Sequence, residues 1–261
     1  MRRSAPLLAL ALLAALPAAA QDRNDGNAGA RLLRYPDVSA TDIAFVHGGD
    51  IWRVPRAGGV ATRLTSHAGQ ELYPKFSPDG RWIAFSAEYS GTRQVWVMPA
   101  AGGEPRQLTW YGDVGPLPVR GGTDYRVLDW TPDGRHVLVR MNRVPWDERG
   151  GRPYLVPVDG GTETALAVPE TGGGSLSPDG TKYAYTPIDA DWRGWKRYRG
   201  GRAPDVWVYD FGAPVGALDG PANDRSTRVT DFRGMDMNPA WVGDAIYFAS
   251  DRSGTLNLYK V

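Results

Sequence analysis

The sequence predicts an all-β fold, a β-propeller built from four-stranded antiparallel blades. The first observation is composition, because 33 Gly and 21 Pro among 261 residues favour short strands joined by many turns. The second is a repeat, in which residues 76–80 (FSPDG) recur as 130–134 (WTPDG) and 176–180 (LSPDG). The third is the spacing of the copies, a basic period of about forty residues with insertions, which is typical of propeller blades.

The N-terminal region is expected to direct export. Residues 1–20 place Arg2 and Arg3 before an apolar run that ends in small residues, the order of a secretory signal peptide, and the run is too short to span a bilayer. The alternative is a buried N-terminal helix. We expect cleavage after Ala20 and a polar, flexible leader over residues 21–30. Export without any cysteine suits a bacterial periplasm and excludes a lipid anchor on that residue.

The first blade is expected to begin a propeller domain that covers residues 31–261. A weak copy of the repeat supplies its first two strands, and its Gly58-Gly59 turn leads into a short fourth strand. Trp52 marks its third strand. The other strands predicted for this blade are residues 35–38, 43–46 and 63–65.

The second blade shows the repeat most clearly. After Phe76, Pro and Asp occupy the centre of a tight turn that Gly ends. We expect the carboxylates of Asp79, Asp133 and Asp179 to cap the backbone of their turns rather than to bind a ligand. The other strands predicted for this blade are residues 82–85, 95–98 and 106–109.

The third, fourth and fifth blades follow the same order. Their first strands are anchored by Trp130, Leu176 and Trp241, which align with Val38 and Phe76 of the first two blades. The strands predicted beyond these anchors are residues 136–139, 183–185, 206–209, 246–248 and 256–261.

The fifth blade lacks a Gly-Gly turn and a fourth strand, so about five blades are expected and the last is incomplete. An isolated open propeller exposes apolar blade faces and an unpaired edge. We therefore expect a piece of a longer protein, truncated within the fifth blade. The alternative is a divergent small propeller that closes with its N-terminal strand.

Charge and residue content exclude most chemistry within this chain. The formal net charge of +1 provides no global attraction for nucleic acid, and no cysteine is present for thiol catalysis or Cys-ligated zinc. The three histidines show no metal-ligand spacing, and no G-x-S-x-G nucleophile elbow occurs. We predict no catalytic residue, no metal and no cofactor. Repeated tryptophans, namely Trp52, Trp96, Trp130, Trp207 and Trp241, are predicted to form core between blades.

One insertion in the fourth blade carries a local charge feature. The segment from Trp192 to Arg202 is basic and aromatic and contains no acid. Guanidinium groups suit a peptide carboxylate, and the alternatives are packing against another domain or a solvated loop. The candidate peptide or interface contacts are Trp192, Arg193, Trp195, Lys196, Arg197, Tyr198, Arg199 and Arg202.

Arginines in two further insertions can line the same mouth of the propeller as the basic segment. These insertions cover residues 111–126 and 141–152. The arginines in and beside them are Arg120, Arg126, Arg140, Arg143 and Arg149.

Two strings, residues 76–85 (FSPDGRWIAF) and 94–109 (QVWVMPAAGGEPRQLT), resemble the blade repeat of TolB propellers and tricorn-type peptidases. Three others carry a closer resemblance, namely residues 49–52 (GDIW), 195–210 (WKRYRGGRAPDVWVYD) and 246–252 (IYFASDR). Together they resemble the N-terminal six-bladed propeller of exported tricorn-like serine proteases, over essentially residues 31–261.

The resemblance implies a propeller module that gates or channels peptide substrates or products, while the serine peptidase chemistry lies in domains absent from this chain. Its implied partners are peptides, the remaining domains of the peptidase and further copies in a homo-oligomer, with no nucleic acid and no membrane span. Two alternatives stay open, a TolB-like periplasmic protein-binding propeller and the propeller module of an exported amidohydrolase. Peptide specificity and oligomeric state stay open too.

Overall fold

The computed structural model describes residues 32–111, 125–141, 151–168, 170–188, 197–215 and 225–261. Leu32–Val261 form one compact unit. Throughout the described residues the regular structure is β-strand, without any helix. The strands of the first three sheets are β1 (Arg34–Val38), β2 (Asp42–His47), β3 (Asp50–Pro55), β4 (Thr62–Arg63), β5 (Glu71–Phe76), β6 (Trp82–Ala87), β7 (Gln94–Pro99), β8 (Arg106–Gln107), β9 (Tyr125–Trp130), β10 (His136–Met141), β11 (Arg152–Pro157) and β12 (Thr164–Ala165). Those of the last two are β13 (Gly174–Leu176), β14 (Lys182–Tyr185), β15 (Trp207–Asp210), β16 (Ser226–Arg228), β17 (Asp236–Val242), β18 (Ala245–Ser250) and β19 (Asn257–Lys260).

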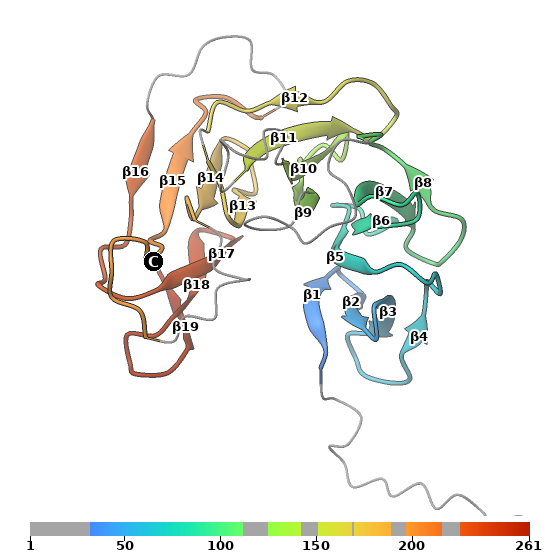
Figure 1. Ribbon diagram of the computed structural model, residues 1–261, viewed down its shortest axis with the longest axis horizontal. Coiled ribbons are helices and arrows are strands. Elements are labelled where there is room, and N and C mark those ends of the chain that lie inside the picture. Colours follow the sequence, from blue (N-terminus) through green and yellow to red (C-terminus); the bar gives the residue numbers. More distant parts are fainter. Residues whose placement is uncertain (1–31, 112–124, 142–150, 169, 189–196, 216–224) are drawn as a thin grey trace, which may run out of the picture. The chain divides into compact units, whose positions relative to one another are not determined.

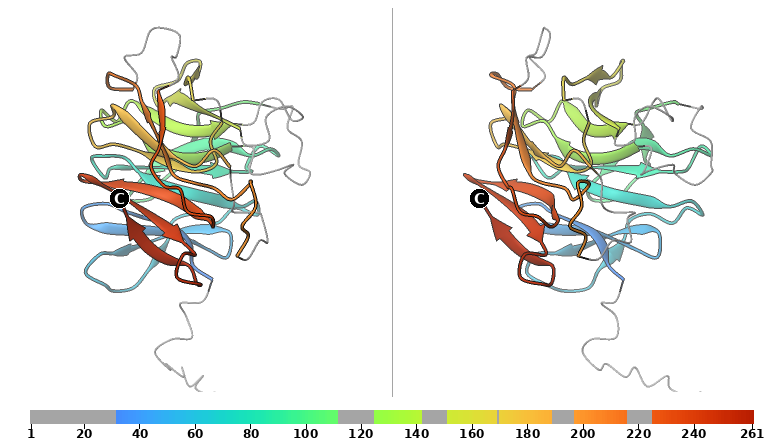
Figure 2. Two further views of the ribbon diagram at one scale, coloured as in Figure 1. Left: turned by 90° about the vertical axis from the view of Figure 1, so that its left-hand side faces the viewer. Right: turned by 60° about the vertical axis from the view of Figure 1, so that its left-hand side comes forward.

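The strands form five antiparallel sheets, each a meander in chain order. We call them blades 1 to 5. Blades 1 to 4 have four strands each, and blade 5 has three, β17, β18 and β19. The blades follow one another along an arc, with blade 1 and blade 5 at its two ends (Figure 1). Side views show the same sheets stacked face to face (Figure 2). The predicted all-β propeller architecture with four-stranded blades is confirmed.

The first strand of each blade lies on the inside of the arc. These inner strands contact one another in chain order, β1 with β5, β5 with β9, β9 with β13 and β13 with β17. The five predicted anchor positions are equivalent, because each anchor pairs with the second residue of the strand that follows it in the blade. The pairs are Val38 with Ile43, Phe76 with Ile83, Trp130 with Val137, Leu176 with Tyr183, and Trp241 with Ile246.

The Pro-Asp-Gly turns have the geometry that the sequence predicts. Asp79 Oδ1 accepts hydrogen bonds from Ser77 Oγ at 2.6 Å and from the backbone N of Arg81 at 3.0 Å. Asp133 and Asp179 make the same pair of bonds at the same distances in their own turns. The closing glycines have φ near +70°, a region that L side chains disfavour. The capping role of these three carboxylates is confirmed.

A second repeated contact fixes the outer strand of three blades. In blade 1 the hydroxyl of Thr65 accepts a hydrogen bond from the backbone N of Ile51 at 2.9 Å. Thr109 binds Val95 in blade 2, and Thr230 binds Val206 in blade 4, at the same distance. These bonds extend the pairing of very short fourth strands, which have few backbone hydrogen bonds of their own.

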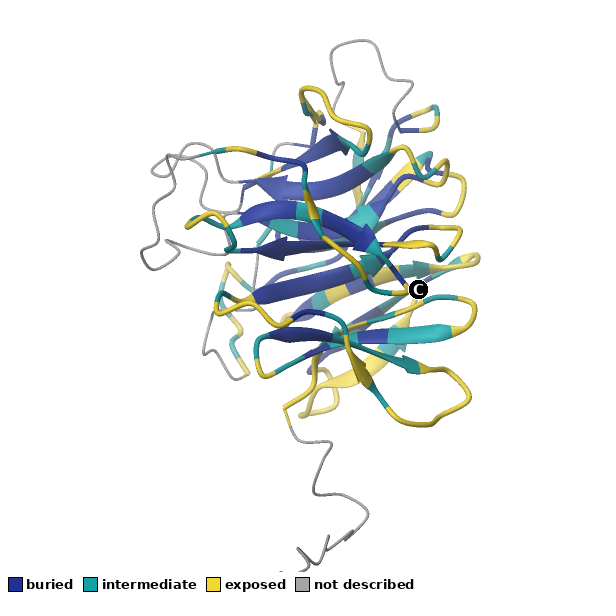
Figure 3. Cartoon of the chain, turned by 90° about the vertical axis from the view of Figure 1, so that its right-hand side faces the viewer, coloured by how far each residue is buried: buried dark blue, intermediate teal, exposed yellow. Residues whose placement is uncertain are grey.

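Apolar side chains fill the spaces between neighbouring blades. Separate clusters join blade 1 to blade 2, blade 2 to blade 3, blade 3 to blade 4, and blade 4 to blade 5. Burial is greatest in the strands, and the hairpin turns are exposed (Figure 3). The middle blades are buried on both faces, whereas each end blade has one face without a neighbouring sheet among the described residues.

The predicted role of the tryptophans holds at most of their positions. Trp130 is buried, and Trp96, Trp207 and Trp241 pack against the clusters between blades. Trp52 has the equivalent place in blade 1, but it pairs with Phe45 on the outward face, where it is half-buried. Position in the repeat is therefore shared, while burial depends on whether another blade lies alongside.

Candidate functional site

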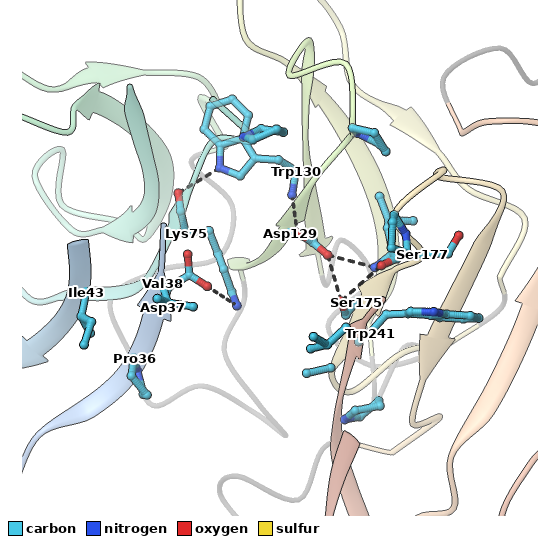
Figure 4. Close-up of a pocket in the computed structure, with 18 residues that line it drawn as sticks. Pro36, Asp37, Val38, Ile43, Lys75, Asp129, Trp130, Ser175, Ser177 and Trp241 are labelled. Atoms are coloured by element: carbon cyan, nitrogen blue, oxygen red, sulfur yellow. Dashed lines mark hydrogen bonds and ion pairs between the residues drawn. The ribbon is translucent and has the colours of Figure 1, made fainter. Parts of the chain in front are cut away.

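The inner strands of all five blades border a cavity on the axis of the arc. Its volume is about 770 Å3. Prolines and tryptophans form much of its wall, and three charged side chains lie within it (Figure 4). Those charged residues are Asp37, Lys75 and Asp129.

Asp37 joins blade 1 to blade 2 at this cavity. Its Oδ2 accepts a hydrogen bond from the backbone N of Phe76 at 2.8 Å, and its Oδ1 lies 3.0 Å from Lys75 Nζ. Asp37 directly precedes the anchor Val38, so the repeat itself places this carboxylate on the axis. The carboxylate satisfies a backbone donor of the next blade, which fixes the two inner strands relative to each other.

Asp129 repeats this arrangement between blade 3 and blade 4. Its Oδ2 accepts hydrogen bonds from the backbone N of Leu176 at 2.9 Å and from Ser175 Oγ at 3.1 Å. Its Oδ1 accepts one from the backbone N of Trp130 at 2.9 Å. Burial is the largest influence and raises the pKa of Asp129, against the lowering effects of Lys75 and these hydrogen bonds.

Lys75 lies between the two carboxylates and comes from blade 2. Burial opposes its charge, but Asp37 and Asp129 outweigh burial and raise the pKa of Lys75. Its backbone oxygen accepts a hydrogen bond from Trp130 Nε1 at 2.9 Å. Lys75 is therefore a fixed, protonated ammonium group in the cavity, and its main chain also ties blade 2 to blade 3.

A second cavity of about 470 Å3 adjoins the first along the axis. Both cavities are lined by Lys75 and Ala240. The second is also lined by Tyr35, Tyr73 and Arg126, together with Asn238. The guanidinium carbon of Arg126 lies 4.7 Å from the centre of the Tyr73 ring.

The sequence analysis did not single out these axial residues. A usable signal was present, because Asp37, Lys75 and Asp129 each directly precede an anchor residue. Of the arginines expected near a mouth, Arg126 lies at the second cavity, but it comes from strand β9. Arg140 does not line a mouth, since it is 1% exposed in β10 and donates a hydrogen bond to the backbone oxygen of Gly172. Its place in a strand buried on both faces explains the difference, and Arg120, Arg143 and Arg149 lie outside the described residues.

The described part of the basic segment packs against blade 5. Arg199 Nη1 lies 2.7 Å from Oδ2 of the buried Asp251, and Arg197 Nε donates to the backbone oxygen of Gly254 at 3.2 Å. Tyr198 is half-buried and Arg202 is exposed. Contact of this segment with a peptide or another domain stays a prediction. The other predicted contacts, Trp192, Arg193, Trp195 and Lys196, lie outside the described residues.

The described residues that line the two cavities do not form a hydrolytic centre. The described residues that line them include no histidine, and the hydroxyl of Ser175 is directed at Asp129. Across the described ranges no group of three His, Cys, Asp or Glu residues is arranged to hold a metal ion. No helix of sufficient length and apolar character to cross a membrane occurs in those ranges either.

Comparison with known proteins gives one consistent result. The profile of the family described as Tricorn protease N-terminal beta propeller domain matches residues 30–261. Tricorn protease homolog 1 of Streptomyces coelicolor is 33% identical over 231 residues, which are 87% of this chain and 20% of that protein. The chain thus spans about a fifth of the length of that relative.

Two solved structures support the fold. The crystal structure of the tricorn protease aligns with a TM-score of 0.71 and 22% identity, covering 88% of this chain and 21% of that one. TolB from Acinetobacter baumannii aligns with a TM-score of 0.65 and 20% identity, covering 88% of this chain and 51% of that one.

Proposed function

The chain belongs to the tricorn protease N-terminal β-propeller family, and we propose that it works as the propeller module of a longer, exported tricorn-like serine peptidase. In this proposal the axial cavities channel peptide substrates or products, and catalysis takes place in other domains. The observation that carries it is an axial cavity bordered by inner strands of all five blades in a chain of this family.

The apolar faces of the end blades support a six-bladed ring. Val38 and Phe45 lie on the outward face of blade 1, and Val38 is 58% exposed. Val242 and Leu258 lie on the outward face of blade 5, at 60% and 71% exposed. We propose that a sixth blade from the longer protein packs between these two faces, because exposed apolar sheet faces favour burial.

The module proposal is tested by the size of the native protein. An antibody against residues 197–215 would capture the polypeptide from source cells, and intact mass spectrometry would measure it. A species several times heavier than 28.4 kDa is expected. A species near that mass would contradict the module proposal. It would favour a TolB-like protein-binding propeller, which the likeness to TolB structures makes the second candidate.

The channelling role is tested by blocking the passage. The chain has no cysteine, so Ala240→Cys places a single thiol at a position that lines both cavities. In a longer peptidase freed of other cysteines, a bulky maleimide on this thiol is expected to slow peptide hydrolysis strongly. Val60→Cys, at a position 88% exposed and outside both cavities, is the matched control and should leave hydrolysis unchanged. Equal rates for both labelled proteins would contradict channelling.

Export to the periplasm is a further part of the proposal. The order of charged, apolar and small residues in residues 1–20 supports cleavage after Ala20 and a periplasmic location, and sequencing of the mature N-terminus tests this.

We assign the segment from Trp192 to Arg202 to contact with the remaining domains or with peptides. Its support is the composition of the segment, which is basic and aromatic and contains no acid.

A further inference from the structure

A cluster of charged side chains lies at the boundary between blades 1 and 2, apart from the residues that line the axial cavities. Glu71, the first residue of β5, is fully buried there, and its Oε2 accepts a hydrogen bond from Thr65 Oγ1 at 3.0 Å. The hydroxyl of Tyr89 is its other polar neighbour. Asp50 is also buried, and its Oδ2 lies 2.8 Å from Arg63 Nη2. Two buried carboxylates therefore share one arginine.

The boundary between blades 4 and 5 has an equivalent cluster with a different charge balance. Asp236 is the fully buried acid on the inner strand, and Asp205 is the acid before the third strand, with its Oδ2 2.7 Å from Arg228 Nη2. In both clusters the arginine also donates from Nε to a threonine backbone oxygen at 2.8 Å. Here, however, the inner acid has its own cation, because Arg252 Nη2 lies 2.9 Å from Asp236 Oδ2. Two acids are balanced by two arginines.

Tyr89 and Arg252 have the same position in the repeat. The inner acids of the two clusters pair with the last residues of β6 and β18, which are Ala87 and Ser250. Tyr89 and Arg252 each follow two residues later. Blade 2 therefore has a neutral phenol at the place where blade 5 has the arginine that balances the second acid. Among the described residues no ion pair reaches Glu71.

The other titratable groups beside the cluster do not replace that arginine. They come from the β2–β3 hairpin, the segment before β5 and the segment after β6, and they are His47, His67, Glu88 and Arg93. Arg93 is already paired with Glu88. The His67 ring packs edge-on against Tyr89, and its Nδ1 accepts a hydrogen bond from the backbone N of Gly69 at 2.9 Å. None of the four forms an ion pair with Glu71 in the described part of the chain.

This arrangement makes the ionised form of Glu71 unfavourable. Burial is the largest influence, and repulsion from Asp50 adds to it, so the pKa of Glu71 is raised to about 7. When Glu71 is protonated, Asp50 and Arg63 remain as a balanced pair. The cluster then has the same net charge as the one between blades 4 and 5.

We propose that the boundary between blades 1 and 2 is a pH-sensitive switch controlled by Glu71. With Glu71 protonated, the cluster is neutral and blade 1 stays packed against blade 2. With Glu71 ionised, two buried carboxylates face one arginine, and blade 1 separates more readily because water then reaches the excess charge. Blade 1 supplies Asp37 to the wall of the axial cavity, so opening at this boundary displaces part of that wall.

The test is hydrogen exchange of the full 261-residue chain at pH 5.5 and pH 8. Rates are expressed as protection relative to unstructured peptides, so that the chemical effect of pH on exchange cancels. Between these two values, protection of β3 and β5 is expected to fall about tenfold more than that of β15 and β17, because only the first boundary has an unbalanced acid.

Exchange of the two equivalent residues tests the role of the missing cation. Tyr89→Arg supplies a second arginine and is expected to abolish the extra loss at the boundary between blades 1 and 2. Tyr89→Phe is the matched control, which adds no charge and should retain the loss. Arg252→Tyr is expected to create a similar pH-dependent loss between blades 4 and 5. Glu71→Gln removes the titrating group, and it decides the matter if Tyr89→Arg does not fold.

Two results overturn the inference. The first is an equal loss of protection at the two boundaries in the parent chain. The second is an extra loss between blades 1 and 2 that persists in Glu71→Gln or in a folded Tyr89→Arg, because neither variant has an unbalanced buried acid at this boundary.

Discussion

Phe85 in blade 2 and Phe45 in blade 1 occupy the same position of the repeat but have different surroundings. Each faces a tryptophan on the third strand, Trp96 and Trp52 respectively. Phe85 is fully buried because blade 1 covers it, whereas Phe45 is half-buried on the outward face of blade 1. The comparison shows that a blade is a sheet with two apolar faces, and that its neighbours determine how much of that surface contributes to stability.

The second strands of blade 3 and blade 5 show the same contrast. In β10, five consecutive residues, 137–141, are buried. In β18, buried residues alternate with half-buried ones, as expected when only one face of a sheet is covered. The apolar residues are similar in kind, so the difference arises from packing.

The largest expected effect comes from the matched phenylalanines. Phe85→Ala is expected to lower the free energy of unfolding by about 3 to 5 kcal/mol, because it opens a cavity between two blades. Phe45→Ala should cost about 1 kcal/mol, since its side chain already contacts solvent. Urea unfolding followed by tryptophan fluorescence measures both values. Equal losses would show that the outward face of blade 1 is covered.

The second largest expected loss of stability concerns the axial carboxylates. Asp129→Ala leaves the backbone N of Leu176 without its acceptor and is expected to cost about 2 kcal/mol. Blade 5 has alanine at the equivalent place, so Ala240→Ser is a matched control with little expected change. Urea unfolding of both variants provides the comparison, and a neutral Asp129→Ala would contradict the role of this carboxylate in joining blades.

A pH dependence is expected at the boundary between blades 1 and 2. Burial raises the pKa of Glu71 to about 7 from 4.5, while hydrogen bonds from Thr65 and Tyr89 oppose the rise. The folded protein therefore binds this proton more tightly than the unfolded chain does. The resulting stabilisation is complete below pH 4.5 and is lost as pH rises from 4.5 to 7, by about 3 kcal/mol.

Glu71→Gln tests this dependence, because glutamine mimics the protonated acid. Unfolding measured from pH 5 to 8 should show a flatter profile for the variant than for the parent chain. A similar hydrogen bond to a glutamine occurs in blade 2, where the Thr109 hydroxyl donates to the amide oxygen of Gln94 at 2.7 Å. An unchanged profile in Glu71→Gln would assign the dependence to another group.

The smallest effect is expected at an exposed ion pair. Arg81 Nε lies 2.6 Å from Asp79 Oδ2 in the outer turn of blade 2, and both side chains are accessible to solvent. Arg81→Ala is expected to change stability by less than about 0.5 kcal/mol. Thermal unfolding at low and high salt measures this effect. A loss similar to that of Asp129→Ala would contradict the distinction between axial and outer contacts.

The sequence was sufficient to predict the blades because their signals are local. Pro-Asp-Gly turns and the five anchor residues depend on the residues beside them, and their register was confirmed. Burial of Trp52 was not predictable from its position, because it depends on whether another sheet lies alongside. Arg140 was expected near a loop, but it belongs to a strand that two neighbouring blades bury.

The axial site was harder to predict, since its residues are far apart in sequence and each resembles an ordinary strand residue. Lys75 and Asp129 line the same cavity only because inner strands of successive blades converge on one axis. A local trace of the site exists in the dipeptides Tyr35-Pro36, Tyr73-Pro74 and Asn238-Pro239, which share one position of the repeat. Their left-handed geometry required the structure, because a residue before proline usually adopts an extended conformation.

Hydrogen exchange resolved by strand tests most directly the claim that neighbouring blades determine burial. In the full 261-residue chain, the amides of β6 and β10 are expected to exchange slowest, because both faces of their sheets are covered. The amides of β2 and β18, in the end blades, are expected to exchange faster. Equal protection in all four strands would contradict the account, since it would mean that the outward faces of blades 1 and 5 are packed as tightly as the faces between blades.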